Sequence, residues 1–124
     1  MFFACVRFSR VALVGVVLLI PHFARAQSVP EPPTGVGSDL ADNCPTGLID
    51  WNASVGATFY QVYVEQAFPP WTGGGLISTV SGTEAWYRYQ LGGHPYMFGV
   101  AACNASGCSP IATTYSGVSP YVCP

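Results

Sequence analysis

Short stretches of alternating apolar and polar residues recur along the chain from about residue 47 onwards. In ATFYQVYVE, residues 57–65, Tyr60, Val62 and Val64 share one face, and the other face includes glutamine and glutamate. The stretch YMFGVAAC, residues 96–103, repeats the alternation around an aromatic and aliphatic row. A period of two places successive side chains on opposite faces, as in a β-strand. Both stretches are therefore predicted to be strands that turn one face to the core.

Further short strands are predicted on the same grounds, and no stretch shows a sustained helical period. They are GLIDW at 47–51, LISTVSG at 76–82, TEAWYRYQL at 83–91, and an edge strand within 109–124 that is interrupted near Ser116 and Gly117. The connections FPPWTGGG, residues 68–75, and LGGHP, residues 91–95, contain the glycine and proline that turns use. Strands at intervals of roughly 8 to 12 residues predict an all-β sandwich or barrel.

The first 26 residues have the layout of a secretory signal peptide. Arg7 and Arg10 precede the apolar run VALVGVVLLI, and Ala24 and Ala26 form an A-x-A cleavage site. The alternative is a transmembrane anchor, but a run of ten apolar residues is shorter than the roughly 20 that a membrane span needs. We expect cleavage after Ala26 and no membrane span afterwards. The chain that remains divides into a proline-rich extended leader, residues 27–35, and one domain, residues 36–124.

Removal of the signal peptide changes the charge balance. Arg88 is then the last basic residue against six carboxylates, which leaves a net charge of −5. Proteins that bind phosphate backbones or anionic lipids do so through basic patches. Nucleic acid is therefore excluded as a partner.

The order of these features resembles a fibronectin type III domain. The resemblance runs from PPTGV through LIDWNAS and GATFYQVYV to YMFGVAACNASGCS, and its most specific part consists of Tyr96, Phe98, Val100, Ala102, Asn104, Gly107 and Ser109, preceded by Leu91. The chain departs from the family pattern in the short interval LGGHPY, in the glycine-rich WTGGGL and in its cysteines.

The resemblance implies a seven-stranded β-sandwich of the fibronectin type III or immunoglobulin-like class. Strands A, B and E would form one sheet and strands C, C′, F and G the other. Such domains serve as spacers and recognition modules in extracellular proteins, and their fold carries no catalytic machinery. The resemblance therefore implies a binding or structural module that is not an enzyme and needs no cofactor.

The cysteines have two alternative roles, as zinc ligands or as disulfides. Four remain after signal removal, which in an exported chain favours disulfides, whereas their spacing lacks the paired knuckles of a zinc site and no C-x-x-C motif is present. In the topology that the resemblance implies, Cys103 ends strand F and Cys108 starts strand G. They would face each other across a hairpin, at a distance that a disulfide tolerates. Cys44 would then pair with Cys123.

Other candidate chemistry is weaker. Asn52 and Asn104 each begin an Asn-Ala-Ser sequon, the acceptor pattern for N-glycosylation. His94 is the sole histidine after signal removal, and its Gly-Gly-His-Pro setting indicates a turn residue and no general base. No metal site and no catalytic residue is predicted.

Aromatic residues outside the predicted core are candidates for recognition, since exposed rings stack on sugars or anchor proteins. The candidate binding surface consists of Trp71, Trp86 and Tyr63, with Asn104 and Ser106 at the tip of the last hairpin. We expect a secreted, periplasmic or cell-surface module that binds an extracellular protein or glycan. One alternative is a carbohydrate-binding or enzyme-accessory module, which would need both tryptophans on one flat surface. A small exported hydrolase is the less favoured alternative.

Overall fold

The computed structural model describes residues 27–40, 44–90 and 92–123, so the predicted signal peptide, its cleavage site after Ala26, and Leu91 lie outside the described residues. The described residues form strands and turns. The strands are β1 (Thr34–Asp39), β2 (Thr46–Asn52), β3 (Phe59–Glu65), β4 (Gly75–Val80), β5 (Glu84–Arg88), β6 (Pro95–Asn104), β7 (Gly107–Cys108) and β8 (Ala112–Val118). Within these residues no helix is long and apolar enough to cross a membrane.

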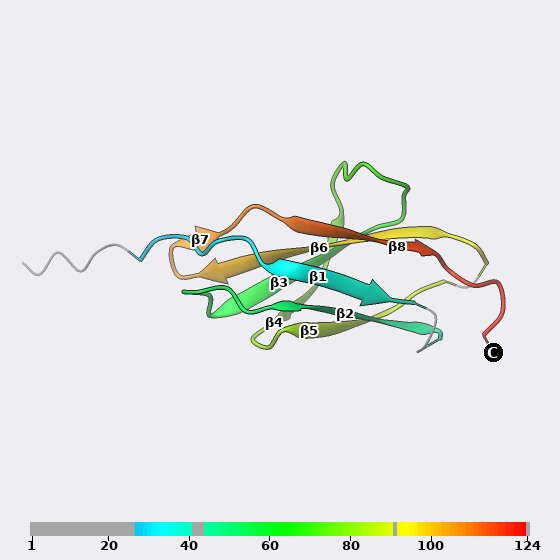
Figure 1. Cartoon of the computed structure of the whole chain (residues 1–124), viewed down its shortest axis with the longest axis horizontal. Helices are drawn as coiled ribbons and strands as arrows, with labels where there is room; N and C mark the ends of the chain where they lie inside the picture. The colour runs from blue at the N-terminus through cyan, green and yellow to red at the C-terminus, as the bar shows by residue number, and fades with distance from the viewer. Residues whose placement is uncertain (1–26, 41–43, 91, 124) are drawn as a thin grey trace, which may run out of the picture.

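Two antiparallel sheets pack face to face (Figure 1). One sheet has the order β1-β2-β5, and the other has the order β4-β3-β6, with β7 and β8 both pairing with β6. This confirms the predicted β-sandwich and the assignment of strands to its two sheets. The strand count is eight and not seven, because the last predicted strand is divided into β7 and β8.

The division of the last strand falls at Pro110 and not at the predicted positions, Ser116 and Gly117. Proline has no backbone N–H to give to the ladder. The preceding residue, Ser109, compensates: the N–H of Ala102 donates to its hydroxyl over 3.0 Å, and the hydroxyl donates to the Pro110 carbonyl over 2.8 Å. At residues 116 and 117 of β8 a bulge shifts the register of its pairing with β6, and the strand continues to Val118.

The core lies between the two sheets and follows the predicted alternation. Ile49 in β2, Val62 in β3 and Phe98 in β6 are fully buried. The other buried core residues are Leu40, Trp51, Tyr60, Ala85, Tyr89, Tyr96, Val100 and Ala102. Tyr87 packs against this core, with its ring centroid 5.5 Å from that of Phe98 in an edge-on arrangement. Burial of these apolar rows from both sheets is the main stabilising contribution.

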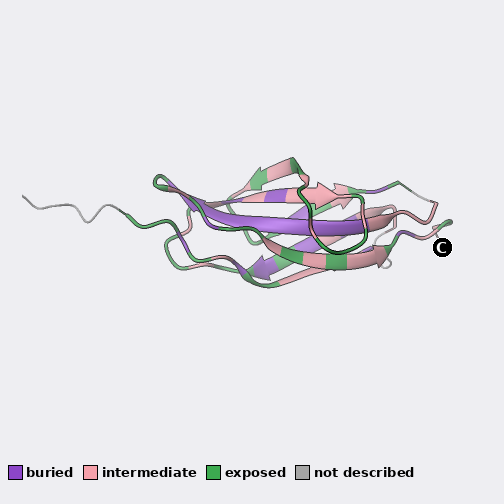
Figure 2. Ribbon diagram, turned by 90° about the horizontal axis from the view of Figure 1, so that it is seen from above, coloured by how far each residue is buried: buried purple, intermediate pink, exposed green. Residues whose placement is uncertain are grey.

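Strand β6 is buried on both of its faces, as its continuous colour in Figure 2 shows. The row that faces away from the core consists of Met97, Gly99, Ala101 and Cys103. An antiparallel sheet normally exposes such a row to water, with polar side chains. The apolar residues here indicate that another part of the chain covers the outer face of the five-stranded sheet.

The two disulfides fix different parts of the fold. Cys44 and Cys123, with Cα atoms 5.4 Å apart, join the segment before β2 to the C-terminal segment. Cys103 and Cys108 are directly opposed in β6 and β7. Both pairs are those that the implied topology predicts.

The N-terminal leader packs on the domain. Strand β1 begins at Thr34, inside the segment predicted as an extended leader, and Pro30 and Pro33 are buried.

Candidate functional site

The predicted candidate residues lie on different surfaces of the sandwich. Trp86 alternates in β5 with the core-facing Ala85 and Tyr87, so it points outward from the three-stranded sheet, with 54% of its surface exposed. Tyr63 lies on the outer face of the five-stranded sheet, directly opposite Gly99. Trp71 covers Gly99 on that same face. The two tryptophans are therefore on opposite sides of the molecule, and the flat surface that a two-tryptophan glycan platform would need is not formed.

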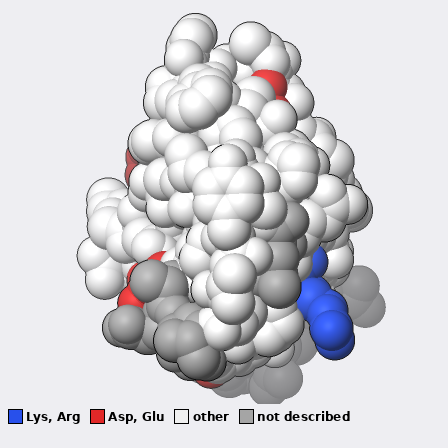
Figure 3. Space-filling view, turned by 90° about the vertical axis from the view of Figure 1, so that its right-hand side faces the viewer, with Lys and Arg blue, Asp and Glu red and all other residues white. Residues whose placement is uncertain are grey.

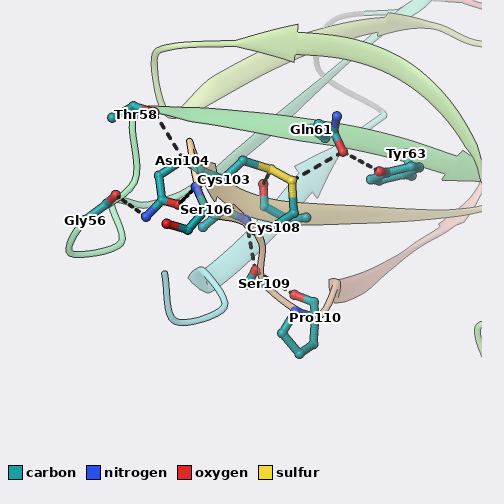
Figure 4. The surroundings of a disulfide bond; sticks show 12 residues. Gly56, Thr58, Gln61, Tyr63, Cys103, Asn104, Ser106, Cys108, Ser109 and Pro110 are labelled. Carbon is teal, nitrogen blue, oxygen red and sulfur yellow. Dashed lines mark hydrogen bonds between the residues drawn. A yellow bond between two sulfur atoms is a disulfide. The ribbon is translucent and has the colours of Figure 1, made fainter. Parts of the chain in front are cut away.

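Asn104 is a structural residue and not part of an exposed binding surface, which corrects the sequence-based expectation. It is only 3% exposed. Its amide nitrogen donates to the carbonyls of Ser28 and Gly56, over 2.8 Å and 3.2 Å, and its oxygen accepts the N–H of Ser106 over 2.8 Å (Figure 4). Ser106 itself is exposed. Through these three hydrogen bonds the Asn104 side chain joins the leader, the loop after β2 and the last hairpin.

The contacts of Asn104 distinguish its sequon from the sequon at Asn52. In the folded chain the Asn104 side chain is buried and hydrogen bonded, so no room is left for a glycan. Asn52 is exposed at the end of β2, and its amide nitrogen lies 3.3 Å from the Thr34 hydroxyl. Only the Asn52 sequon is compatible with a modified folded domain.

The disulfide beside Asn104 is exposed on one side only. Cys103 is fully buried and Cys108 is exposed. The Cys108 sulfur lies 3.7 Å from the side-chain oxygen of Gln61, which also accepts a hydrogen bond from the Tyr63 hydroxyl over 2.7 Å (Figure 4). The disulfide thus packs on the same outer sheet face that carries Tyr63.

The segment that covers this outer face is the connection between β3 and β4, residues 66–74, which we call the cover loop. In Figure 1 it rises above β6 and β8, and in Figure 2 it crosses in front of them. A Cβ atom placed on Gly99 would lie 3.2 Å from Cη2 of Trp71 and 2.5 Å from Cγ2 of Ile111. The Trp71 ring and Ile111 thus occupy the space that a side chain at position 99 would need. Glycine in a strand often marks such a close approach.

Hydrogen bonds to Glu65 hold the cover loop at the end of β3. The Thr72 hydroxyl donates to one oxygen of the Glu65 carboxylate, and the Thr72 N–H donates to the other over 3.0 Å. These hydrogen bonds lower the pKa of the Glu65 carboxyl from its ordinary value of 4.5, and the bond from the Thr72 hydroxyl has the largest effect. Hydrogen bonds to a carboxylate favour its charged form. These hydrogen bonds hold the loop to the sheet while Glu65 is ionised, and they weaken as the pH falls through its lowered pKa.

The cover loop, β8 and the residue before β8 together form a group of exposed and half-buried apolar side chains, which we call the aromatic patch: Phe68, Trp71, Ile111 and Tyr115. The rings of Phe68 and Tyr115 lie 6.2 Å apart, centroid to centroid, at an angle of 46°. Phe68 is 62% exposed, Tyr115 41% and Ile111 37%. The sequence pattern singled out Trp71 alone. The signal for Ile111 and Tyr115 was the alternation of Ile111, Thr113 and Tyr115, which is weak beside the prolines of that segment.

Charged groups are few on the described surface. At the end of the molecule seen in Figure 3, most of the visible surface is uncharged, with acidic groups at several places around its margin and a basic group at the lower right. Over residues 27–40, 44–90 and 92–123 no three His, Cys, Asp or Glu side chains are placed to hold a metal ion, and no pocket is found.

Comparison with solved structures decides the fold. No family model matches the chain, and no curated protein matches it. The domain FN3tt is 22% identical, with a TM-score of 0.65 over 77% of this chain and 99% of that one. The fn3 domain of the human collagen alpha-1(XX) chain is 21% identical, with a TM-score of 0.60 over 79% and 92%. The chain has the fibronectin type III fold.

The fibronectin type III fold gives the aromatic patch its setting. A third similar structure, the fn3 domain of human contactin 1, is 21% identical, with a TM-score of 0.54 over 73% of this chain and 78% of that one. In this fibronectin type III sandwich the cover loop joins the third and fourth strands and returns over the outer sheet face. The loop contains the first four residues of the glycine-rich WTGGGL, which the sequence marked as a departure from the family pattern.

Replacing Gly99 by alanine tests the packing of the cover loop. The new methyl group would meet Ile111 and Trp71, and overpacking of this kind destabilises, so we expect the free energy of unfolding to fall by about 1 to 2 kcal/mol. Urea denaturation measures this change. Gly75→Ala is the matched control, because a Cβ atom at Gly75 has no neighbour within 4 Å. Equal effects of the two substitutions would contradict the contact between Trp71 and Gly99.

Proposed function

We propose that this chain is an exported, non-catalytic binding module that contacts a partner through the aromatic patch. The observation that carries the proposal is the exposed ring pair of Phe68 and Tyr115, next to Ile111 and the edge of Trp71. Clustered exposed apolar side chains mark interaction sites on soluble proteins. Aromatic residues also dominate the energy of protein interfaces.

The chemistry of the patch favours a protein partner over a glycan. Sugar-binding platforms present parallel rings, whereas the ring planes of Phe68 and Tyr115 are inclined at 46°. Trp86, another exposed ring, points outward from the three-stranded sheet on the opposite side of the molecule. A tilted, neutral apolar surface matches the apolar centre of a protein interface.

Export is part of the proposal. The signal-peptide layout of residues 1–26 supports it, as do the two disulfides, which form and persist in oxidising compartments. N-terminal sequencing of the protein recovered from the extracytoplasmic fraction tests this part. The expected first residue is Gln27.

The binding experiment compares aromatic-to-serine variants on opposite faces. Phe68→Ser combined with Tyr115→Ser removes the ring pair of the patch, and Trp86→Ser removes an exposed ring from the other sheet. We expect capture of native extracellular partners to fall by more than about tenfold for the first variant, because central aromatic anchors supply much of the binding energy. Trp86→Ser should capture like the unmodified protein. Quantitative mass spectrometry of the captured fraction is the measurement, and thermal unfolding confirms that both variants fold.

Equal capture by the Phe68→Ser, Tyr115→Ser variant and the unmodified protein would overturn the role of the patch. Loss of capture in Trp86→Ser alone would move the recognition surface to the three-stranded sheet.

A further inference from the structure

Strand β4 forms one edge of the five-stranded sheet, and its second edge pairs with no strand of the described chain. Its sequence, GLISTV, contains no charged residue and no proline. Exposed strand edges present unpaired N–H and C=O groups, and natural proteins usually protect them with charges, with proline or with a covering segment. Gly75, Leu76 and Thr79 in β4 are exposed. The β4 edge lacks the first two protections.

The other edges of the sandwich are better protected. Strand β5, at the edge of the smaller sheet, carries Glu84 and Arg88 within five residues. Strands β1 and β8 lie next to each other, and the hydroxyl groups of Ser38 and Ser116 form a hydrogen bond between them. Strand β4 also lies near β5 without pairing with it, but it carries neither a charge nor a proline, so it is the edge that can accept an additional strand.

A bulge in β4 restricts the kind of strand that can be added. The register between β3 and β4 shifts between Val62 and Tyr63, which leaves Ile77 without a directly opposed partner. A bulge bends its strand and increases the local twist. A flexible peptide can follow a bent edge, whereas the edge of a second folded copy is fixed in shape and would meet an identical bulge.

One carboxylate near β4, that of Glu84, indicates the chemistry of the added strand. Glu84 is directly opposed to Asp50 of β2, whose carboxylate lies towards β1, and both are exposed. Glu84 follows the end of β4 by four residues. Like charges in opposed positions are unfavourable, and a cation placed near them would relieve this repulsion. At the other end of β4, Gly75 pairs with Val64, beside Glu65.

A second copy of the chain would bring the same carboxylates to the same edge. Antiparallel pairing of two β4 strands would place the Glu65 end of each copy near the Glu84 end of the other. Like charges that face each other across an interface suppress association. The charges therefore disfavour self-pairing and favour a basic partner.

We propose that the β4 edge binds an extended peptide segment by strand addition, with β-branched residues in the segment's centre and lysine or arginine at its end beside Glu84. Main-chain hydrogen bonds would supply the affinity, as in other cases of strand addition. The lysine or arginine would make the site prefer basic over acidic peptides. This site is separate from the aromatic patch and does not depend on it.

The test uses the oxidised mature domain and an acetylated, amidated peptide of sequence KTVTVTK. We expect binding by fluorescence anisotropy, together with increased hydrogen-exchange protection of backbone amides in β4 and in no other strand. The same peptide with alternate N-methylated residues cannot form the ladder and should not bind. The peptide ETVTVTE should bind more weakly by about tenfold or more, since like charges oppose it at the edge.

Protein variants test the charge preference without disturbing the strand. Glu84→Gln should weaken binding of KTVTVTK by about twofold to fivefold, the range expected for one exposed charge. Glu31→Gln, a neutralised carboxylate in the leader, is the matched control and should bind normally. The Phe68→Ser, Tyr115→Ser variant should also bind this peptide normally, which keeps the test distinct from that of the proposed function.

Three results would overturn the proposal. These are binding of the N-methylated peptide equal to that of the parent, protection that appears outside β4, and self-association of the domain with protection of β4 in the absence of peptide. The last result would identify a second copy as the occupant of the edge.

Discussion

Replacing both Cys44 and Cys123 by serine is expected to lower the free energy of unfolding by about 4 to 5 kcal/mol, as estimated from the chain entropy of the loop that this disulfide closes. The two residues are 79 positions apart in the sequence. The matched variant replaces Cys103 and Cys108, which are 5 positions apart, and should lose about 2 kcal/mol. Chemical denaturation of both variants measures the difference. The first variant should also have the lower melting temperature.

The contacts around the long-range disulfide support this order. Besides the disulfide, hydrogen bonds attach the segment before Cys123 to the domain. The Gly92 N–H donates to the Pro120 carbonyl over 3.1 Å, and Ser119 and His94 form two hydrogen bonds with each other. Without the disulfide, the segments at Cys44 and Cys123 are no longer joined covalently. Equal losses in the two variants, or a larger loss in the Cys103, Cys108 variant, would refute the ranking.

Asn104→Ala is expected to cost about 3 kcal/mol, since it removes three hydrogen bonds of about 1 kcal/mol each from a buried site. The carbonyls of Ser28 and Gly56 and the N–H of Ser106 would lose their partner. We therefore also expect faster hydrogen exchange at Ser106 and greater protease sensitivity of the leader. Denaturation and exchange measurements check both effects.

Asn52→Ala is the control for this prediction, because Asn52 begins the other Asn-Ala-Ser sequon and is exposed. Its side chain makes a long hydrogen bond to Thr34 at the surface, so the substitution should change stability by less than about 0.5 kcal/mol. A similar loss for both asparagines would show that burial at position 104 does not stabilise the fold.

The strands and their faces were predictable because alternation has a direct physical cause. A residue such as Val62 or Phe98 is apolar because one face of its strand is buried, and its neighbours show which face this is. The pairing of the cysteines followed once the topology was assumed. The fold-level part of the prediction therefore needed only local patterns and a resemblance.

The site was less predictable because its residues come from unrelated patterns. Nothing local indicates that Trp71 covers Gly99, since the contact depends on the path of a loop between two strands. Asparagine is a residue type common in turns, so the sequence gives no sign that Asn104 is buried. It is buried by contacts with Ser28 and Gly56, which are far away in the sequence. Tyr115 joins Phe68 for the same reason. Long-range contacts through irregular segments leave no periodic signal.

The anchoring of the cover loop has a consequence for the affinity of binding. The loop is fixed on one side of Phe68 by β3 and on the other by the Trp71 ring and the Thr72 bonds to Glu65. The backbone that carries Phe68 is thus held in place before any partner arrives. A preorganised contact loses little conformational entropy on association. Substitutions that release the loop, such as Thr72→Val, should therefore weaken affinity while leaving every residue of the contact surface unchanged.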